Sequence, residues 1–520
     1  MKIIDKSWLK HLIKNDDVIA IAAISCCNLP AELLKEIIQL HDVQQEPNQL
    51  TFLLANDISD YTNQIYDLDA FVERGMVKCL IMSIMIGSPK TIQAMKNNDI
   101  EAYYLPQGVI ATHYRNQTST SLGTITKIGL NTTVDPLYEG GKINSKTTKD
   151  LVKRIEIEGE TYLKYEFPNI DVALLRGTYA DKDGNIYMTE EAHLGEGYSV
   201  ALAARRNKGK VIVQVKAIIE NGRFNPKDVF IPSALVDYIF INQESKYHKQ
   251  VVQTYYDPAL AGEYRLLEMP EQPIPLSERK VILRRASQYL NRNDVVSIGF
   301  GINNELSNIL VEEKADHLVQ LNMDTGVFGG WIGSRKWFGM NYNVEARVRH
   351  DMTWDFIYSG GIDVAFLSFA EVDQHGNVNV SEFGDKMNGC GGFIDISQSV
   401  KKIIFSGSLV VKSKLVLNSQ KVEVMDKGKG AKFVNQVHHV DFNAMYALEM
   451  GQEIYYVTER AVFQLTPKGI MLIEIAPDLD LKKDVLEYIE FNPLVSPDLK
   501  RMDRKIYHEI WGELAHELMS

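Results

Sequence analysis

The chain has 520 residues, more than one hydrophobic core normally holds, so we expect two or three domains. Its 45% hydrophobic and 24% charged residues are typical of an ordered globular protein and argue against extensive disorder. The formal net charge is -12 and no block of Lys or Arg stands out, so we expect no nucleic-acid partner.

The cysteines and the apolar runs argue against several further classes of protein. Cys26, Cys27, Cys79 and Cys390 form neither a CxxC pair nor a Cys/His cluster with zinc spacing, so we expect no disulfide framework and no metal. The longest apolar run near the N-terminus, 18–29, is too short to span a bilayer and follows two aspartates rather than a basic region. It predicts a buried strand, with no signal peptide and no membrane partner, in a cytoplasmic protein.

Apolar, β-branched runs alternate with helical segments along the chain. Residues 18–24 predict a strand, and 30–38 predict a helix because Pro30 suits a first helical turn and apolar positions recur at helical spacing. Further strands are expected at 80–85, 211–215 and 402–406. Runs that are apolar on both faces and separated by helices predict a mainly parallel sheet in an α/β fold.

A repeat divides the chain into two halves. Residues 170–185 match residues 362–377 at an offset of 192; both segments begin Ile-Asp-Val-Ala and end Gly-Asn. The offset persists further on, where Val211-Ile-Val falls beside Ile403-Ile-Phe, and Asp17-Val18 corresponds more weakly to Asp294-Val295. A shared hairpin turn that arose by chance is the alternative. A matching strand, turn and later strand favour two homologous open α/β domains that pack face to face.

Domain boundaries follow from the composition between the halves. Residues 248–279 are rich in proline and polar side chains, which is typical of a linker. We therefore predict an N-terminal domain at 1–255, a linker at 256–279 and a C-terminal domain at 280–520.

Three glycine-rich segments lie in the second half, at 298–302, 324–330 and 388–394. Each adjoins a predicted strand, where glycine allows backbone N–H groups to approach a ligand closely. None fits a Walker A loop, and the first lacks the full dinucleotide fingerprint. Any one of them alone would indicate an ordinary tight turn.

Further short motifs occur in a fixed order along the chain. They are Leu105-Pro-Gln-Gly108, Lys127-Ile-Gly-Leu130, Val134-Asp-Pro136, Glu139-Gly-Gly-Lys142, Ile231-Pro232, Trp354-Asp-Phe356, Gly360-Gly-Ile-Asp363, Gly376-Asn-Val-Asn-Val-Ser381, Gly389-Cys-Gly-Gly-Phe393 and Tyr456-Val-Thr-Glu-Arg-Ala-Val-Phe463. From about residue 14 to about residue 510 the chain resembles the family I CoA-transferases, in particular the fused single-chain type that includes acetate and propionate CoA-transferases.

The resemblance implies a ping-pong transfer of coenzyme A, the co-substrate, between short carboxylic acids such as acetate, propionate, butyrate and acetoacetate. A glutamate attacks the acyl-CoA thioester to give an acyl–glutamyl anhydride, and the released thiolate then forms an enzyme–CoA thioester. The thioester's free energy is conserved, so neither ATP nor a metal is required. The resemblance also implies an active site between the domains and a homodimer or homotetramer.

The nucleophile's position departs from the family. The family's glutamate stands in a Glu-Ser/Thr-Gly segment two residues before a Gly-Gly pair, and the matching residue here is Asp324. Aspartate lacks one methylene, which sets its oxygens back by roughly 1.5 Å, and a misplacement of about 1 Å costs around a hundredfold in rate. A plain turn residue and an introduced change are the alternatives. Glu305 and Glu371 are two carboxylates that could replace Asp324, but neither stands in the motif.

Other site residues are carried over from the resemblance. The backbone N–H of Gly391 is the expected oxyanion donor, and Gln107 is expected to face the site from the N-terminal domain. The glycines expected to contact CoA are Gly299, Gly301, Gly329, Gly330, Gly389, Gly391 and Gly392.

Several residues are assigned no chemical role. Cys390 lies beside glycines with no paired histidine motif, so we expect it to pack. We assign His375, His438 and His439 to surface or packing roles. Ala22-Ala23 replace glycines common in the family, which bears on the shape of the carboxylate pocket.

Two other functions stay open at this point. A thioester hydrolase would result if the shorter aspartate admits water to the intermediate. A CoA-binding protein without turnover would result if the fold persisted and the chemistry were lost.

Overall fold

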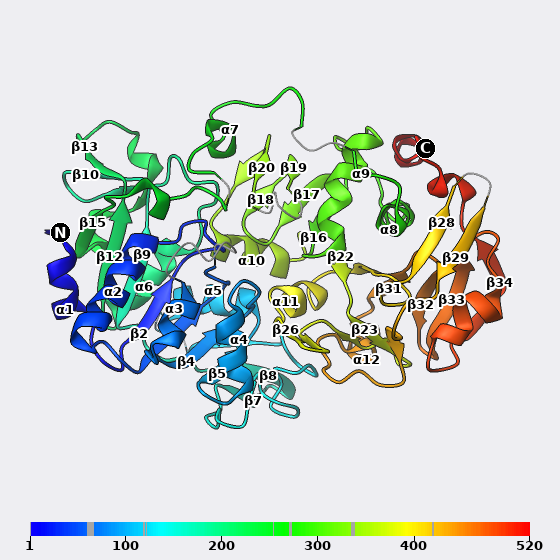
Figure 1. Cartoon of the computed structure of the whole chain (residues 1–520), viewed down its shortest axis with the longest axis horizontal. Coiled ribbons are helices and arrows are strands. Elements are labelled where there is room, and N and C mark those ends of the chain that lie inside the picture. The colour runs from blue at the N-terminus through cyan, green and yellow to red at the C-terminus, as the bar shows by residue number, and fades with distance from the viewer. Residues whose placement is uncertain are drawn as a thin grey trace.

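The computed structural model describes residues 2–59, 67–117, 120, 122–252, 254–269, 273–333, 339–418 and 421–520. Two large sheets lie side by side, one from each half of the chain (Figure 1). This arrangement confirms the predicted α/β fold with two parallel-sheet units.

Within the described residues, the first sheet has eight strands, and every neighbouring pair in it is parallel. In spatial order they are β1 (Lys2–Ile4), β15 (Tyr238–Ile241), β12 (Lys210–Val215), β9 (Val172–Arg176), β2 (Val18–Ile21), β3 (Leu50–Leu54), β4 (Val77–Met82) and β5 (Glu101–Tyr104). The strands predicted in this half correspond to β2, β4 and β12.

The second sheet has ten strands, with a parallel centre and antiparallel additions on each side. In spatial order they are β21 (Ala346–Arg347), β18 (Val327–Phe328), β17 (Gln320–Met323), β16 (Val295–Ile298), β22 (Val364–Ser368), β27 (Lys402–Ser406), β31 (Glu453–Val457), β32 (Ala461–Thr466), β33 (Gly469–Ile475) and β34 (Leu494–Arg501). The strand predicted at 402–406 is β27.

Smaller sheets and hairpins surround these two. Their strands are β6 (Thr124–Thr126), β7 (Val152–Ile157), β8 (Glu160–Tyr165), β10 (Tyr179–Asp181), β11 (Ile186–Tyr187), β13 (Ala217–Ile219), β14 (Val229–Ile231), β19 (Trp331–Ile332), β20 (Asn341–Tyr342), β23 (Glu371–Asp373), β24 (Val378–Asn379), β25 (Glu382–Phe383), β26 (Lys386–Met387), β28 (Lys414–Leu417), β29 (Val422–Asp426) and β30 (Phe433–Val434).

Helices pack against the sheets, as α6 does on β2, β9 and β12. They are α1 (Leu9–Leu12), α2 (Ala31–Gln44), α3 (Leu68–Glu73), α4 (Pro89–Lys96), α5 (Gln107–Asn116), α6 (Gly197–Arg206), α7 (Pro258–Ala261), α8 (Glu278–Ser287), α9 (Leu306–Glu312), α10 (His350–Tyr358), α11 (Phe393–Ser397), α12 (Ala444–Glu449) and α13 (Leu514–Met519). The helix predicted at 30–38 is α2. Among the described residues, no helix combines the length and apolar character needed to cross a membrane.

The sequence repeat is also a structural repeat. β9, β10, β11 and β12 recur as β22, β23, β24 and β27 at the same offset of 192 residues. In both halves the turn is closed by an aspartate that accepts from the backbone and side chain of an asparagine. Asn185 donates to Asp181 at 2.9 Å in each bond, and Asn377 donates to Asp373 at 3.0 Å. Equivalent contacts in both copies confirm that the halves are homologous in structure.

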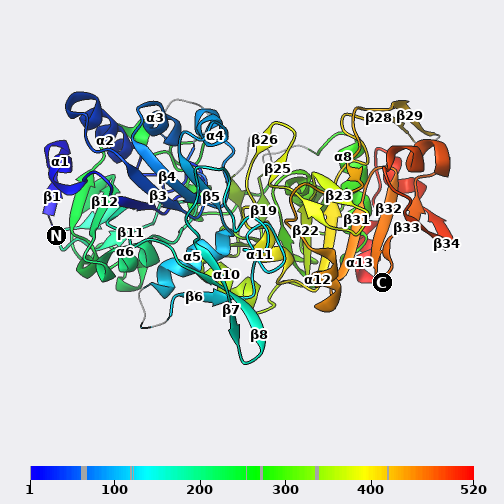
Figure 2. The same cartoon turned by 90° about the horizontal axis from the view of Figure 1, so that it is seen from below.

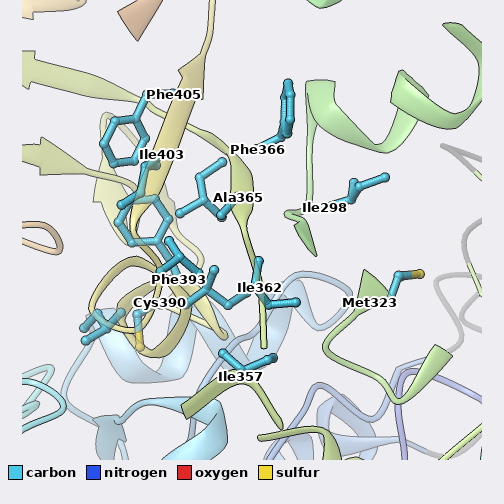
Figure 3. Packing of buried hydrophobic residues seen from close by; sticks show 14 of the residues in the cluster. Ile298, Met323, Ile357, Ile362, Ala365, Phe366, Cys390, Phe393, Ile403 and Phe405 are labelled. Carbon is cyan, nitrogen blue, oxygen red and sulfur yellow. The ribbon is translucent and has the colours of Figure 1, made fainter. Parts of the chain in front are cut away.

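The core of the second half supports the segments that later form the site. Phe405 of β27 is buried beside Phe393 at the start of α11, whereas Phe366 of β22 is buried on the opposite face of the sheet (Figure 3). The rings of Phe393 and Phe405 are 5.8 Å apart, and burial of each such side chain contributes about 1.5–3 kcal/mol. The backbone before α11 is therefore anchored on the sheet.

The two halves meet around α5 from the first half and α10 and α11 from the second (Figures 1 and 2). The strands of the first sheet come from residues 2–241 and those of the second from residues 295–501. The division at 256–279 stays a prediction, and residues 270–272 of that linker lie outside the described part of the chain.

Candidate functional site

Asp324 directly follows β17, at the edge where parallel strands end. β16 and β17 pair in parallel with Ser297 opposite Asn322, so Gly299 and Asp324 leave the sheet at the same edge. Ligands of open α/β sheets bind beyond the carboxyl ends of the strands. Asp324 is partly exposed, so an incoming molecule has access to it.

Groups from both halves surround the carboxylate of Asp324. The side chain of Gln107 and the backbone N–H of Thr325 both donate to it. A methyl group placed on Gly392 would lie 2.8 Å from Asp324 Oδ2, so the 389–392 loop closes against the carboxylate. Burial raises the pKa of Asp324, while His350 and these two hydrogen bonds oppose that shift. The site thus holds a carboxylate that is partly desolvated yet hydrogen-bonded.

The second half also fixes Gln107, the first residue of α5. Gly391 O accepts from Gln107 N at 3.0 Å. Asp395 accepts from Gly108 N at 3.1 Å and Val109 N at 3.2 Å, which satisfies first-turn N–H groups that an α-helix leaves without partners. Burial raises the pKa of Asp395 to about 7 despite these bonds. A buried carboxylate of one half therefore caps the helix that carries Gln107 in the other half.

The expected oxyanion donor, Gly391, has another hydrogen-bond partner in this structure. The N–H of Gly391 donates to Ser83 O at 2.9 Å, so it is not free to bind a substrate oxygen in this structure. The N–H of Gly392 has no hydrogen-bond partner among the described residues, and Gly392 lies closer to Asp324. Gly391 thus joins the loop to the first half, and the neighbouring N–H of Gly392 is the nearer candidate for an oxyanion donor.

The structure adds two site residues that sequence reasoning missed, His350 and Glu196. His350 begins α10 and is completely buried. Its Nδ1 lies 2.9 Å from Glu196 Oε2, and its Nε2 lies 2.9 Å from Gln107 Nε2 and 3.0 Å from Trp354 Nε1. No local pattern marks either residue, because Glu196 and His350 are 154 positions apart.

The remaining glycines are explained by close packing. A methyl group on Gly299 would lie 2.8 Å from Leu367, and one on Gly389 would lie 2.4 Å from Ser83 O. Gly329 and Gly330 have φ values of 66° and 78° and approach Glu345 and the Tyr342 carbonyl. These four glycines and Gly301 are needed by the backbone whether or not they contact CoA.

The alternative carboxylates lie elsewhere. Glu305 is buried at the start of α9 and pairs with Arg279 at 3.2 Å. Glu371 accepts from Asn379 Nδ2 at 2.8 Å inside a small sheet. Neither is part of the Asp324 cluster.

The other residues from the sequence analysis have simple environments. Cys390 is buried in the loop, and Cys26, Cys27 and Cys79 are buried in the first half. Ala22 and Ala23 are buried just after β2. His375 is exposed in the Asp373 turn, as predicted.

His439 differs from the expected surface or packing role. It lies 3.1 Å from Glu139 of the first half and 3.2 Å from Glu382 of the second, beside a small cavity. These carboxylates raise its pKa to about 10, although burial opposes them. His438 is exposed and brings a third potential metal ligand within 4.8 Å of His439 and Glu382. The proton on His439 competes with any cation there.

Comparisons with known proteins agree with this architecture. The model of the family described as "Coenzyme A transferase" matches residues 6–242. The chain is 38% identical to a caffeate CoA-transferase of Acetobacterium woodii, over 99% of this chain and 98% of that protein. It is 35% identical to the acetate CoA-transferase YdiF of Escherichia coli K12, over 89% of this chain and 87% of that one.

Solved structures extend the agreement to the whole fold. The acyl-CoA transferase YdiF apoenzyme from Escherichia coli O157:H7 matches with a TM-score of 0.91 at 32% identity, over 98% of this chain and 97% of that one. YdiF in a thioester complex with CoA matches with a TM-score of 0.90 at 31% identity and the same coverage. With near-complete coverage in sequence and in structure, the chain belongs to the coenzyme A transferase family.

Proposed function

We propose that this enzyme transfers CoA between short carboxylic acids by a ping-pong mechanism, with Asp324 as the covalent nucleophile. One observation carries the proposal. The partly exposed carboxylate of Asp324 lies where the two halves meet, between a side-chain amide donor, Gln107, and a glycine loop that ends at Gly392. The competing carboxylates of Glu305 and Glu371 are engaged elsewhere.

The first half-reaction begins when an Asp324 oxygen attacks the thioester carbonyl carbon. Negative charge develops on the carbonyl oxygen. The donors that stabilise it are the N–H of Gly392 and the Gln107 N–H that bonds Asp324 before the attack. The C–S bond breaks and CoA leaves as a thiolate, with an acyl–aspartyl anhydride on the enzyme. A raised pKa makes an ionised carboxylate a stronger nucleophile, so partial desolvation of Asp324 assists this step.

The thiolate then attacks the aspartyl carbonyl carbon and releases the first carboxylate, which leaves an enzyme–CoA thioester. An incoming carboxylate attacks this thioester, and the same steps in reverse deliver a new acyl-CoA and free Asp324. The remote part of CoA supplies binding energy for these covalent steps. The glycines at 299, 301, 329, 330, 389, 391 and 392 are the proposed CoA-contacting backbone.

The acceptor acid is the least constrained part of the proposal. The resemblance favours acetate, propionate, butyrate or acetoacetate. The relative that is aligned over 98% of its length is named for caffeate, an aromatic acid. A substrate panel therefore has to include both short aliphatic acids and caffeate.

The test is acyl exchange, combined with mapping of the covalent adduct. Acetyl-CoA is incubated with each acid in excess, and new acyl-CoA and free thiol are both quantified. Intact-mass measurement without an acceptor should show addition of CoA with loss of water, and peptide mapping should locate it at Asp324. Asp324→Ala should lose about 10⁶-fold in kcat, as removal of a covalent nucleophile does in a comparable enzyme.

Other outcomes separate the alternatives. Thiol release without exchange would indicate a thioester hydrolase, and binding without either would indicate a CoA-binding protein. Asp324→Glu should raise exchange if side-chain length limits the rate. An active Asp324→Ala variant without an adduct at position 324 would refute the nucleophile assignment.

A further inference from the structure

We infer that His350, held by Glu196, is a positioning residue that fixes the amide of Gln107 with its NH₂ group toward Asp324. This inference rests on the proposed function and names a residue pair that sets up the same site. The juxtaposition that carries it is a buried chain of contacts from Glu196 through His350 and Gln107 to Asp324.

The neighbours of His350 determine where its proton resides. Trp354 Nε1 lies 3.0 Å from His350 Nε2, and an indole N–H only donates. His350 Nε2 therefore carries a lone pair, and the ring proton is on Nδ1. There it faces Glu196 Oε2 at 2.9 Å. A carboxylate on one ring nitrogen thus selects the tautomer that the other nitrogen presents.

The tautomer in turn orients Gln107. Gln107 Nε2 is 2.9 Å from the accepting Nε2 of His350, so one of its two N–H groups is used there. The other faces Asp324, to which the Gln107 side chain donates. The amide oxygen of Gln107 then faces Gly391, because a methyl group placed on Gly391 would lie 3.8 Å from that oxygen. A flipped amide would place its oxygen against a lone pair and a carboxylate, which repel it.

Burial makes one tautomer of His350 and one orientation of the Gln107 amide strongly preferred. Glu196, His350 and Trp354 are each 0% exposed, and Gln107 is 3% exposed. Water therefore does not compensate a wrong tautomer or a flipped amide. Glu196 also precedes α6, where the helix dipole favours a carboxylate. Its second oxygen has no hydrogen-bond partner in the described part of the chain, so its bond to His350 is the contact that holds it.

Protonation of His350 would reverse the orientation of the Gln107 amide. The ring Nε2 would then carry a proton and face two other donors, Gln107 Nε2 and Trp354 Nε1. The charged groups that face the ring are Glu196 beside α6, Asp324 after β17 and Asp351 on α10, and all three favour the protonated form. Burial opposes them, and on balance the pKa of His350 is raised above its ordinary value. The acid side of the pH–rate profile is therefore a readout of this pair, and a purely structural histidine would not change it.

The experiment is a double-mutant cycle between His350→Phe and Gln107→Met, measured as kcat for acyl exchange. Gln107→Met removes one oxyanion donor and should cost about 10²–10³-fold. His350→Phe alone should lower kcat about 10–100-fold, because a displaced Gln107 amide loses most of that stabilisation. In the Gln107→Met background the same substitution should lower kcat by less than about threefold. Costs that simply multiply would overturn the inference.

Further variants keep the test valid. His350→Gln restores an acceptor near the Nε2 position and should recover activity to within about tenfold of wild type. His113→Phe removes another buried imidazole of α5, one that bonds Thr124, and should leave the pH profile unchanged. If His350→Phe does not fold, Glu196→Gln takes its place in the cycle, because its amide supports either tautomer.

The outcomes separate this inference from the proposed function. A CoA adduct on Asp324 together with multiplying costs refutes only the positioning role. An adduct at another residue refutes the nucleophile itself. Unchanged acid limbs in both His350→Gln and Glu196→Gln would also contradict the orientation argument.

Discussion

Gly392→Ala should impair catalysis by crowding the side chain of Asp324, without straining the backbone. The backbone of Gly392 has φ −87° and ψ 6°, which alanine adopts without strain. The new methyl group, however, would lie 2.6 Å from a ring carbon of Trp354 and 2.8 Å from Asp324 Oδ2. Ordinary carbon contacts are about 3.5–4.0 Å, so one neighbour has to move by roughly 1 Å.

The side chain that moves is expected to be Asp324. Trp354 is fully buried and its indole N–H is bonded to His350, whereas Asp324 is partly exposed. A shift of about 1 Å in a reacting group costs around a hundredfold, equivalent to about 2.7 kcal/mol in the barrier. Overpacking should also lower the free energy of unfolding by about 1–3 kcal/mol.

The assay separates these two effects. Acyl exchange and the rate of enzyme–CoA adduct formation report on chemistry, and calorimetric Tm reports on folding. Gly197→Ala is the matched control, since its new methyl group would meet neighbours at 3.4–3.8 Å with no backbone strain, and it should retain normal activity. Normal exchange by a stably folded Gly392→Ala enzyme would refute the close approach of the loop to the nucleophile.

Two further predictions concern the contact between the halves. Asp395→Asn should lower kcat about 10–100-fold by loosening the cap that fixes Gln107, with Tm checked in parallel. Asp355→Asn is the control, because it breaks an exposed ion pair to α5 and should change stability by about 1 kcal/mol or less. Equal losses of kcat in both variants would contradict a specific role for the cap. The second prediction concerns His439, whose pKa is about 10 in the folded protein and 6.5 in the unfolded chain. Its ion pairs therefore stabilise the folded protein fully below pH 6.5, and this stabilisation is lost as the pH rises through 10. Between pH 7 and 10 the Tm of the wild-type enzyme should therefore fall more than that of His439→Gln. The extra loss corresponds to about 1 kcal/mol in the free energy of unfolding. Parallel Tm curves for the two proteins would show that the bridge contributes nothing.

Local patterns in the sequence were sufficient for the architecture and for proposing the position of the nucleophile. Apolar runs with helical spacing between them marked β2, α2, β12 and β27, because burial on both faces of a parallel strand requires such residues. The 192-residue offset revealed the duplicated fold, since homologous units keep the same turn chemistry at Asp181 and Asp373. Asp324 was found because its motif is continuous in the chain.

Only the tertiary structure decided how the site is assembled. Gln107 and His350 are 243 residues apart, and no sequence pattern relates two hydrogen-bond partners at that separation. The N–H of Gly391 looked available until folding placed Ser83 O against it. Buried polar groups find partners wherever the packed chain brings them, so pairing across the two halves is set by the fold as a whole. The sequence identified the carboxylate, and the packing of one half on the other determined which groups orient it.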